Sequence, residues 1–177
     1  NPNSVKVKGA IDIIVARADD YPDALSAAPL ADVLDAPVLL HPSDLVDRDS
    51  RPSHTDMGLH PEVAKEIQRL ANPANSTPRE VEVTVHLLGA TQALSHAVEN
   101  AIDAIPGVDN TLRHQGTNRF QTATSIANVT ANFYRIDSGA KTPDINVYLT
   151  TGIDFPDALA AGAAAAENDG IVLLTNG

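Results

Sequence analysis

The stretch Asp20-Tyr21-Pro22-Asp23-Ala24-Leu25 returns near the other end of the chain as Asp154-Phe155-Pro156-Asp157-Ala158-Leu159. A β-branched run precedes each copy. An alanine-rich segment and then an aliphatic one follow it, Pro37-Val38-Leu39-Leu40 in one case and Ile171-Val172-Leu173-Leu174 in the other. The pattern predicts strand, acidic turn, helix and strand, once near each end of the chain.

Each residue type in the repeated turn suits the start of a helix. The first aspartate can cap free backbone N–H groups, and the second lies near the positive end of the helix dipole. The proline falls in the first turn, where a missing N–H does little harm. We therefore predict that these residues start helices and need no ligand: Asp20, Pro22 and Asp23 in the first copy, and Asp154, Pro156 and Asp157 in the second.

Strands and helices are predicted to alternate along the whole chain. Apolar periodicity predicts helices over 22–34, 61–70, 92–104 and 119–134, the last capped by Asn118 or Thr117, and strands over 11–17, 37–41, 81–88 and 111–113. Strand 37–41 does not alternate, which indicates burial on both faces. Alternation calls for parallel strands with helical crossovers, so we expect a three-layer α/β sandwich with a mainly parallel sheet of about six strands.

Composition excludes several classes of protein. The formal net charge of -11 argues against nucleic-acid partners and against docking on anionic membranes. The absence of cysteine excludes disulfides, thiolate metal sites and cysteine catalysis. No apolar run approaches the roughly 18 residues that span a bilayer. The opening residues Asn1-Pro2-Asn3-Ser4 are not a signal peptide, so we expect a mature chain or a piece of a longer one.

Four segments together resemble the type 2 cell-wall-binding repeat of Gram-positive surface proteins. They are the two Pro-Asp-Ala-Leu turns, the strand Pro37-Val38-Leu39-Leu40, the run Leu87-Leu88-Gly89-Ala90 with Ala93-Leu94-Ser95, and the segment Arg113-His114-Gln115-Gly116-Thr117-Asn118-Arg119-Phe120-Gln121-Thr122-Ala123. Ala90 departs from the family pattern, which has a second glycine there. The two turns are also farther apart than consecutive repeats usually place them, which makes 42–59 and 135–144 insertions.

The resemblance implies a Rossmann-like or Toprim-like unit that has no catalytic residues and needs no cofactor. It implies anchoring to a wall polymer, often by several repeats around a pseudo-threefold axis. In this reading the chain is one compact α/β unit, with the back part of one repeat over 1–112 and the front part of the next over 113–177.

Several residues are candidates for binding. Arg113 and Arg119 could grip a charged polymer group, or could form structural ion pairs with the turn aspartates. The turn Gly89-Ala90-Thr91 could offer N–H groups to an anion, so Gly89 and Thr91 are weaker candidates. Asp20, Asp23, Asp154 and Asp157 are weak candidates for a divalent cation, but helix capping explains them without metal. The histidines show no zinc-site spacing.

The leading hypothesis is a non-catalytic, secreted module of the cell wall or cell surface that associates with a wall polymer or with neighbouring repeats. An acidic chain is repelled by an anionic polymer, so binding requires local arginines, bridging cations or uncharged sugars. One alternative is a purely structural spacer or oligomerisation module. Another is a divalent-metal-dependent α/β hydrolase or phosphotransfer enzyme that uses the turn aspartates.

Overall fold

The computed structural model describes residues 10–42, 58–71, 82–137 and 144–176. Four strands form one parallel sheet in the order β2-β1-β3-β4: β1 (Ala10–Arg17), β2 (Val38–His41), β3 (Glu82–Leu88) and β4 (Asn110–His114). The other two, β5 (Asn146–Thr151) and β6 (Gly170–Thr175), pair in parallel in a separate sheet. All six strands match predicted ones and all pair in parallel, as expected for an α/β fold.

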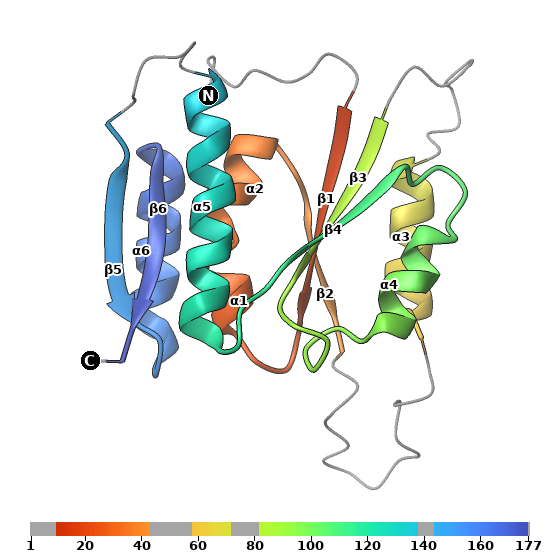
Figure 1. Ribbon diagram of the computed structural model, residues 1–177, viewed down its shortest axis with the longest axis horizontal. Coiled ribbons are helices and arrows are strands. Elements are labelled where there is room, and N and C mark those ends of the chain that lie inside the picture. The colour runs from red at the N-terminus through yellow and green to blue at the C-terminus, as the bar shows by residue number, and fades with distance from the viewer. Residues whose placement is uncertain (1–9, 43–57, 72–81, 138–143, 177) are drawn as a thin grey trace, which may run out of the picture.

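The prediction of a single sheet of about six strands is wrong for the described residues. In Figure 1, α1 (Pro22–Leu25), α2 (Ala28–Leu34) and α5 (Arg119–Asp137) lie between the two sheets. Helix α6 (Phe155–Glu167) packs against α2 and against both strands of the small sheet. Because helices of both copies pack on each other, the second strand pair cannot extend the first sheet.

Helices cover both faces of the four-stranded sheet. On one face, α3 (Pro61–Ala71) and α4 (His96–Asp103) enclose a core that includes Ile13, Val15 and Ile67. On the other face, α2 and α5 enclose a second core around Ile14 and Leu30.

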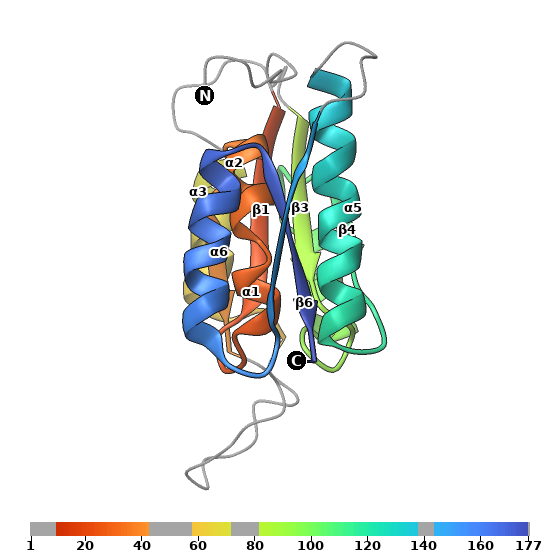
Figure 2. The same ribbon diagram turned by 90° about the vertical axis from the view of Figure 1, so that its left-hand side faces the viewer.

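The small sheet is covered on one face only. In Figure 2 the small sheet is in front, with α6 to its left and α5 to its right, and both helices pack on its inner face. Val172 and Leu174 pack there against alanines of these two helices, in a third core. The opposite face carries Val147 and Leu149, which are 58% and 68% exposed.

The predicted helix over 22–34 is divided into α1 and α2. Pro29 lies in the first turn of α2, where a continuous helix would have placed its ring against the carbonyl of Leu25. In the second copy, alanine stands at the position of Pro29, and α6 runs unbroken over its 13 residues. The small residue Gly162 of α6 lets that helix approach the break, because a Cβ there would lie 3.1 Å from the Leu25 carbonyl oxygen.

Two further predictions about the first copy are wrong. Strand β2 is not buried on both faces, since it is an edge strand with Val38 38% and Leu40 53% exposed. Asp20 is not an N-cap either. Tyr21 holds that position of α1 without a side-chain capping bond, and the Asp20 carboxylate faces two arginines instead.

The helices predicted over 61–70, 92–104 and 119–134 are confirmed as α3, α4 and α5, although α4 begins only at His96, behind the N-cap Ser95. Asn118 caps α5 as predicted, accepting from the N–H of Gln121 at 3.0 Å. Most of the predicted insertion 42–59 and residues 138–143 of the predicted insertion 135–144 lie outside the described residues, and residues 135–137 belong to α5 instead. None of the described helices combines the length and apolar character needed to cross a membrane.

Candidate functional site

A pocket of about 310 Å³ opens at the carboxyl ends of β1, β3 and β4, the edge where parallel sheets usually bind ligands. Its walls come from the turn after β1, the turn after β3, and the segment that leads from β4 into α5. They consist of Arg17, Asp20, Pro22, Asp23, Ala90, Gln92, Ala93, Gly116, Thr117, Asn118, Arg119, Phe120 and Thr122.

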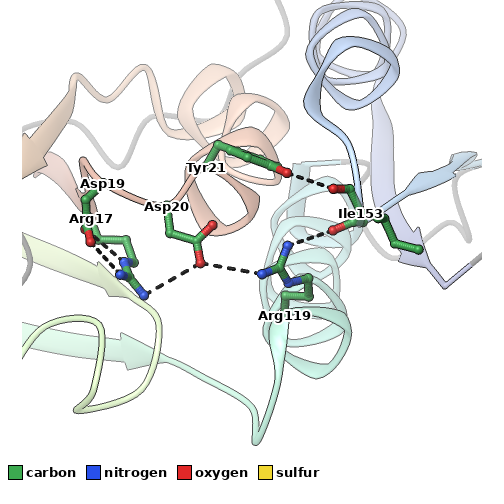
Figure 3. A network of polar contacts seen from close by, with 7 residues as sticks. Arg17, Asp19, Asp20, Tyr21, Arg119 and Ile153 are labelled. Carbon is green, nitrogen blue, oxygen red and sulfur yellow. Dashed lines mark hydrogen bonds and ion pairs between the residues drawn. The ribbon is translucent and has the colours of Figure 1, made fainter. Parts of the chain in front are cut away.

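A chain of charges crosses one side of the pocket (Figure 3). The Arg17 guanidinium donates to both carboxylate oxygens of Asp19, at 3.1 and 2.7 Å, and lies 3.7 Å from Asp20. Asp20 also lies 3.5 Å from Arg119. The hydrogen bond to Asp19 is the main reason why the pKa of Arg17 lies above its usual range, and the negative charges of the neighbouring aspartates add to the shift.

The same residues tie the two copies of the repeated pattern together. Arg119 donates to the Gly152 carbonyl at 2.8 Å, and the Tyr21 hydroxyl donates to the Ile153 carbonyl at 2.8 Å. Gly152 and Ile153 directly follow β5, whereas Asp20 and Tyr21 follow β1. The structural ion pair that the sequence left open for Arg119 is therefore present, and it joins α5 to the first acidic turn.

Asp23 differs from the other carboxylates of the pocket. No hydrogen bond to its carboxyl group is found within the described part of the chain, and the group lies over Gly89, where a Cβ would sit 2.6 Å from Asp23 Oδ2. Burial raises the pKa of Asp23 to about 6; Arg17 and Arg119 oppose the rise, and Asp20 adds to it.

Arg113 does not line the pocket. Its side chain is 8% exposed, and it donates to the Gly89 carbonyl at 2.9 Å and to Glu99 at 3.1 Å. The hydrogen bond from Arg113 to Glu99 is the main reason why the pKa of Glu99 is lowered. Arg113 thus holds the turn at Gly89, whose φ of 106° favours glycine.

The remaining candidates are scattered. Thr91 is exposed and is not a lining residue, whereas Thr122 lines the pocket and accepts from the Gly116 N–H at 3.1 Å. Asp154 and Asp157 are exposed at the start of α6, apart from the pocket. Within the described ranges, no three His, Asp or Glu residues are placed to share a metal ion.

Sequence reasoning missed a row of polar side chains across β1, β3 and β4, in which His86 and His114 are buried. His86 lies 2.9 Å from Asp12 and 2.9 Å from His114, whose ring stacks on that of His86. Burial, and then the neighbouring His86, lower the pKa of His114 to about 4. These residues are far apart along the chain, and only the register of β1, β3 and β4 brings them together.

Comparison with known proteins identifies the family. The sequence model of cell wall binding domain 2 (CWB2) matches residues 3–99 and 113–177. The chain belongs to the CWB2 family. A CWB2 chain is a cell-wall-associated module of a surface protein, and the predicted resemblance is confirmed.

Two solved structures share the fold of this CWB2 chain. Cwp6 from Clostridium difficile is 23% identical with a TM-score of 0.68, over 96% of this chain and 22% of Cwp6. Cwp8 from Clostridium difficile is 25% identical with a TM-score of 0.66, over 98% of this chain and 24% of Cwp8. The chain therefore spans about a quarter of the length of either structure. A search of curated proteins gave no match.

Proposed function

We propose that this CWB2 chain is a non-catalytic, secreted module that holds a polymer of the cell wall in the pocket at the carboxyl ends of β1, β3 and β4. The observation that carries the proposal is the pocket itself, placed at the ligand-binding edge of a parallel sheet in a member of a wall-binding family. Arg119 and Thr122 line this pocket. Gly89 lies against the Asp23 carboxyl group, and Arg113 holds the Gly89 turn by donating to the Gly89 carbonyl.

The chemistry of the lining favours binding over catalysis. Both hydroxyls of the lining are engaged internally, since Thr117 donates to Gln121 at 2.7 Å and Thr122 accepts from Gly116. In the described part of the chain, the hydrogen-bond partners of these two hydroxyls are a backbone N–H and an amide oxygen rather than the general base that nucleophilic catalysis requires.

The repeat boundaries remain part of the proposal. We infer that residues 1–112 are the back part of one repeat and 113–177 the front part of the next. The two matched ranges, 3–99 and 113–177, support this division, as does the separate strand pair of the second copy.

Co-sedimentation with purified Gram-positive cell walls tests the function. Gln92 lines the pocket with an exposed side chain, so Gln92→Trp fills the pocket at little cost to the fold. We expect the unmodified chain to sediment with the walls and the variant to stay in solution. Gln68→Trp, on the exposed side of α3, is the matched control and should sediment normally. If both the unmodified chain and the control stay in solution, with and without EDTA, wall binding by this chain is excluded.

The bare face of β5 and β6 favours a second, additional role in packing against a further repeat. When the two copies are aligned on their Pro-Asp turns, Val147 and Leu149 fall at the positions of Ile13 and Val15. Ile13 and Val15 are fully buried beneath α3 and α4, whereas Val147 and Leu149 are exposed. We infer that another repeat covers this face with two of its helices, as α3 and α4 cover the equivalent face of the first copy. Light scattering of the chain at rising concentration tests this association. We expect association that Leu149→Glu abolishes; a monomer at all concentrations would contradict self-association.

A further inference from the structure

The charges of the pocket are already balanced before any ligand enters. Two guanidiniums, of Arg17 and Arg119, line it together with two carboxyl groups, of Asp20 and Asp23. Arg17 is paired with Asp19 and Asp20, and Arg119 with Asp20 and the Gly152 carbonyl. An incoming phosphate or carboxylate would have to break these pairs, and it would meet the Asp23 carboxylate in a chain of net charge -11.

Besides the two paired arginines, the pocket lining offers a carboxylate acceptor, an apolar surface, and amides that donate as well as accept. The half-buried Asp23 carboxyl accepts no hydrogen bond from the described residues, so both of its oxygens can accept one from a ligand. Gln92 lines the pocket with an exposed amide side chain, and the half-buried ring of Phe120 supplies an apolar wall. A ligand fits this lining if it has hydroxyl groups to donate to Asp23 and C–H groups to pack against the Phe120 ring. A sugar ring has both.

We propose that the pocket takes an uncharged sugar unit of the wall polymer, and that the Asp23 carboxylate accepts hydrogen bonds from its hydroxyl groups. This inference rests on the proposed function and decides how an acidic module can bind a wall polymer. Recognition goes to the sugar ring, and charged groups of the polymer stay outside the pocket in solvent.

The pH dependence of binding separates a sugar from an anion. Hydroxyl groups donate best to the ionised carboxylate, so a sugar binds more tightly as Asp23 loses its proton on going from pH 5 to pH 7.5. An anion is repelled by the ionised carboxylate and would bind more weakly over the same interval. With a pKa of about 6, the ionised fraction rises about tenfold across this range. The other charges that face Asp23 are those of Arg17, Asp20 and Arg119.

Sedimentation with purified cell walls at pH 5 and pH 7.5 tests the inference without knowledge of the sugar. We expect the unmodified chain to bind up to about tenfold more tightly at pH 7.5. Asp23→Asn should bind more weakly at pH 7.5 and lose the difference between the two pH values. Asp157→Asn changes the equivalent, exposed residue of the second copy, and should behave as the unmodified chain. Inorganic phosphate at 0.1 M should not displace the chain beyond the effect of the same ionic strength of sodium chloride.

Each other outcome overturns the sugar assignment while wall binding stands. These outcomes are tighter binding at pH 5, tighter binding by Asp23→Asn, specific displacement by phosphate, or equal behaviour of Asp23→Asn and Asp157→Asn. If the unmodified chain fails to sediment at either pH, the proposed function itself fails.

Discussion

Burial shifts two titratable side chains in opposite directions, and their effects on stability oppose each other. The pKa of Asp23 is raised to about 6, so the folded chain holds a proton there that the unfolded chain releases near pH 4. The pKa of His114 is lowered to about 4, so the folded chain lacks a proton that the unfolded chain binds below about pH 6.5. Between about pH 4 and pH 6, Asp23 makes the free energy of unfolding fall with rising pH, whereas His114 makes it rise.

Asp23→Asn should remove the first effect. We expect the variant to be more stable than the unmodified chain at pH 7 by about 2 kcal/mol, because no buried carboxylate has to ionise. At pH 4 the difference should nearly vanish. Urea unfolding at both pH values measures this, with Asp157→Asn as the exposed control. A variant that is less stable at pH 7 than the unmodified chain would contradict the burial of an unpaired carboxyl.

His114→Gln should remove the second effect. The variant loses the contact with His86, so we expect it to be less stable at pH 7. Its stability should then fall less between pH 6.5 and pH 4, by about 2 kcal/mol, because no buried imidazole has to take up a proton. His96→Gln, at an exposed histidine of α4, is the control. Parallel pH profiles of His114→Gln and the unmodified chain would refute the lowered pKa.

At the scale of elements, equivalent positions of the two copies have different surroundings. Val15 of β1 is fully buried in the core under α3 and α4, whereas Leu149, at the same position of β5, is 68% exposed. Large-to-small substitution is costly in a packed core, because it leaves a cavity, and nearly neutral on an open surface.

Val15→Ala should therefore destabilise the chain by about 2 to 3 kcal/mol, and Leu149→Ala by less than about 0.5 kcal/mol. Thermal or urea unfolding at low protein concentration, where self-association does not contribute, measures both. A cost at Leu149 as large as that at Val15 would mean that the outer face of β5 is covered.

At the scale of the whole molecule, Arg119 and Tyr21 join the two copies. The Arg119–Asp20 pair is about one third exposed on both sides, at 35% and 34%, so it contributes less than a buried pair would. With the bond to the Gly152 carbonyl included, Arg119→Ala should cost about 1 to 2 kcal/mol. Arg69→Ala removes only an exposed pair with Glu66 on α3, and should leave the free energy of unfolding nearly unchanged.

The double variant Arg119→Ala with Tyr21→Phe should also loosen the second strand pair. We expect faster amide hydrogen exchange in β5 and β6 than in the unmodified chain, and little change in β1 and β3, because the lost bonds lead to Gly152 and Ile153. A uniform increase across both sheets would show that the two copies open as one unit.

The sequence by itself determined the kind and order of the elements, the parallel pairing within each copy and the family, because periodicity, turn residues and motifs are local. It did not show that Pro29 divides the predicted helix over 22–34, or that two arginines draw the Asp20 carboxylate away from the predicted capping position, because both depend on neighbouring segments. Only the tertiary structure decided that the strands divide into two sheets, and that Arg17, Asp23, Gln92 and Phe120 meet in one pocket. The reason is that packing between distant segments, rather than local preference, chooses which side chains share a surface.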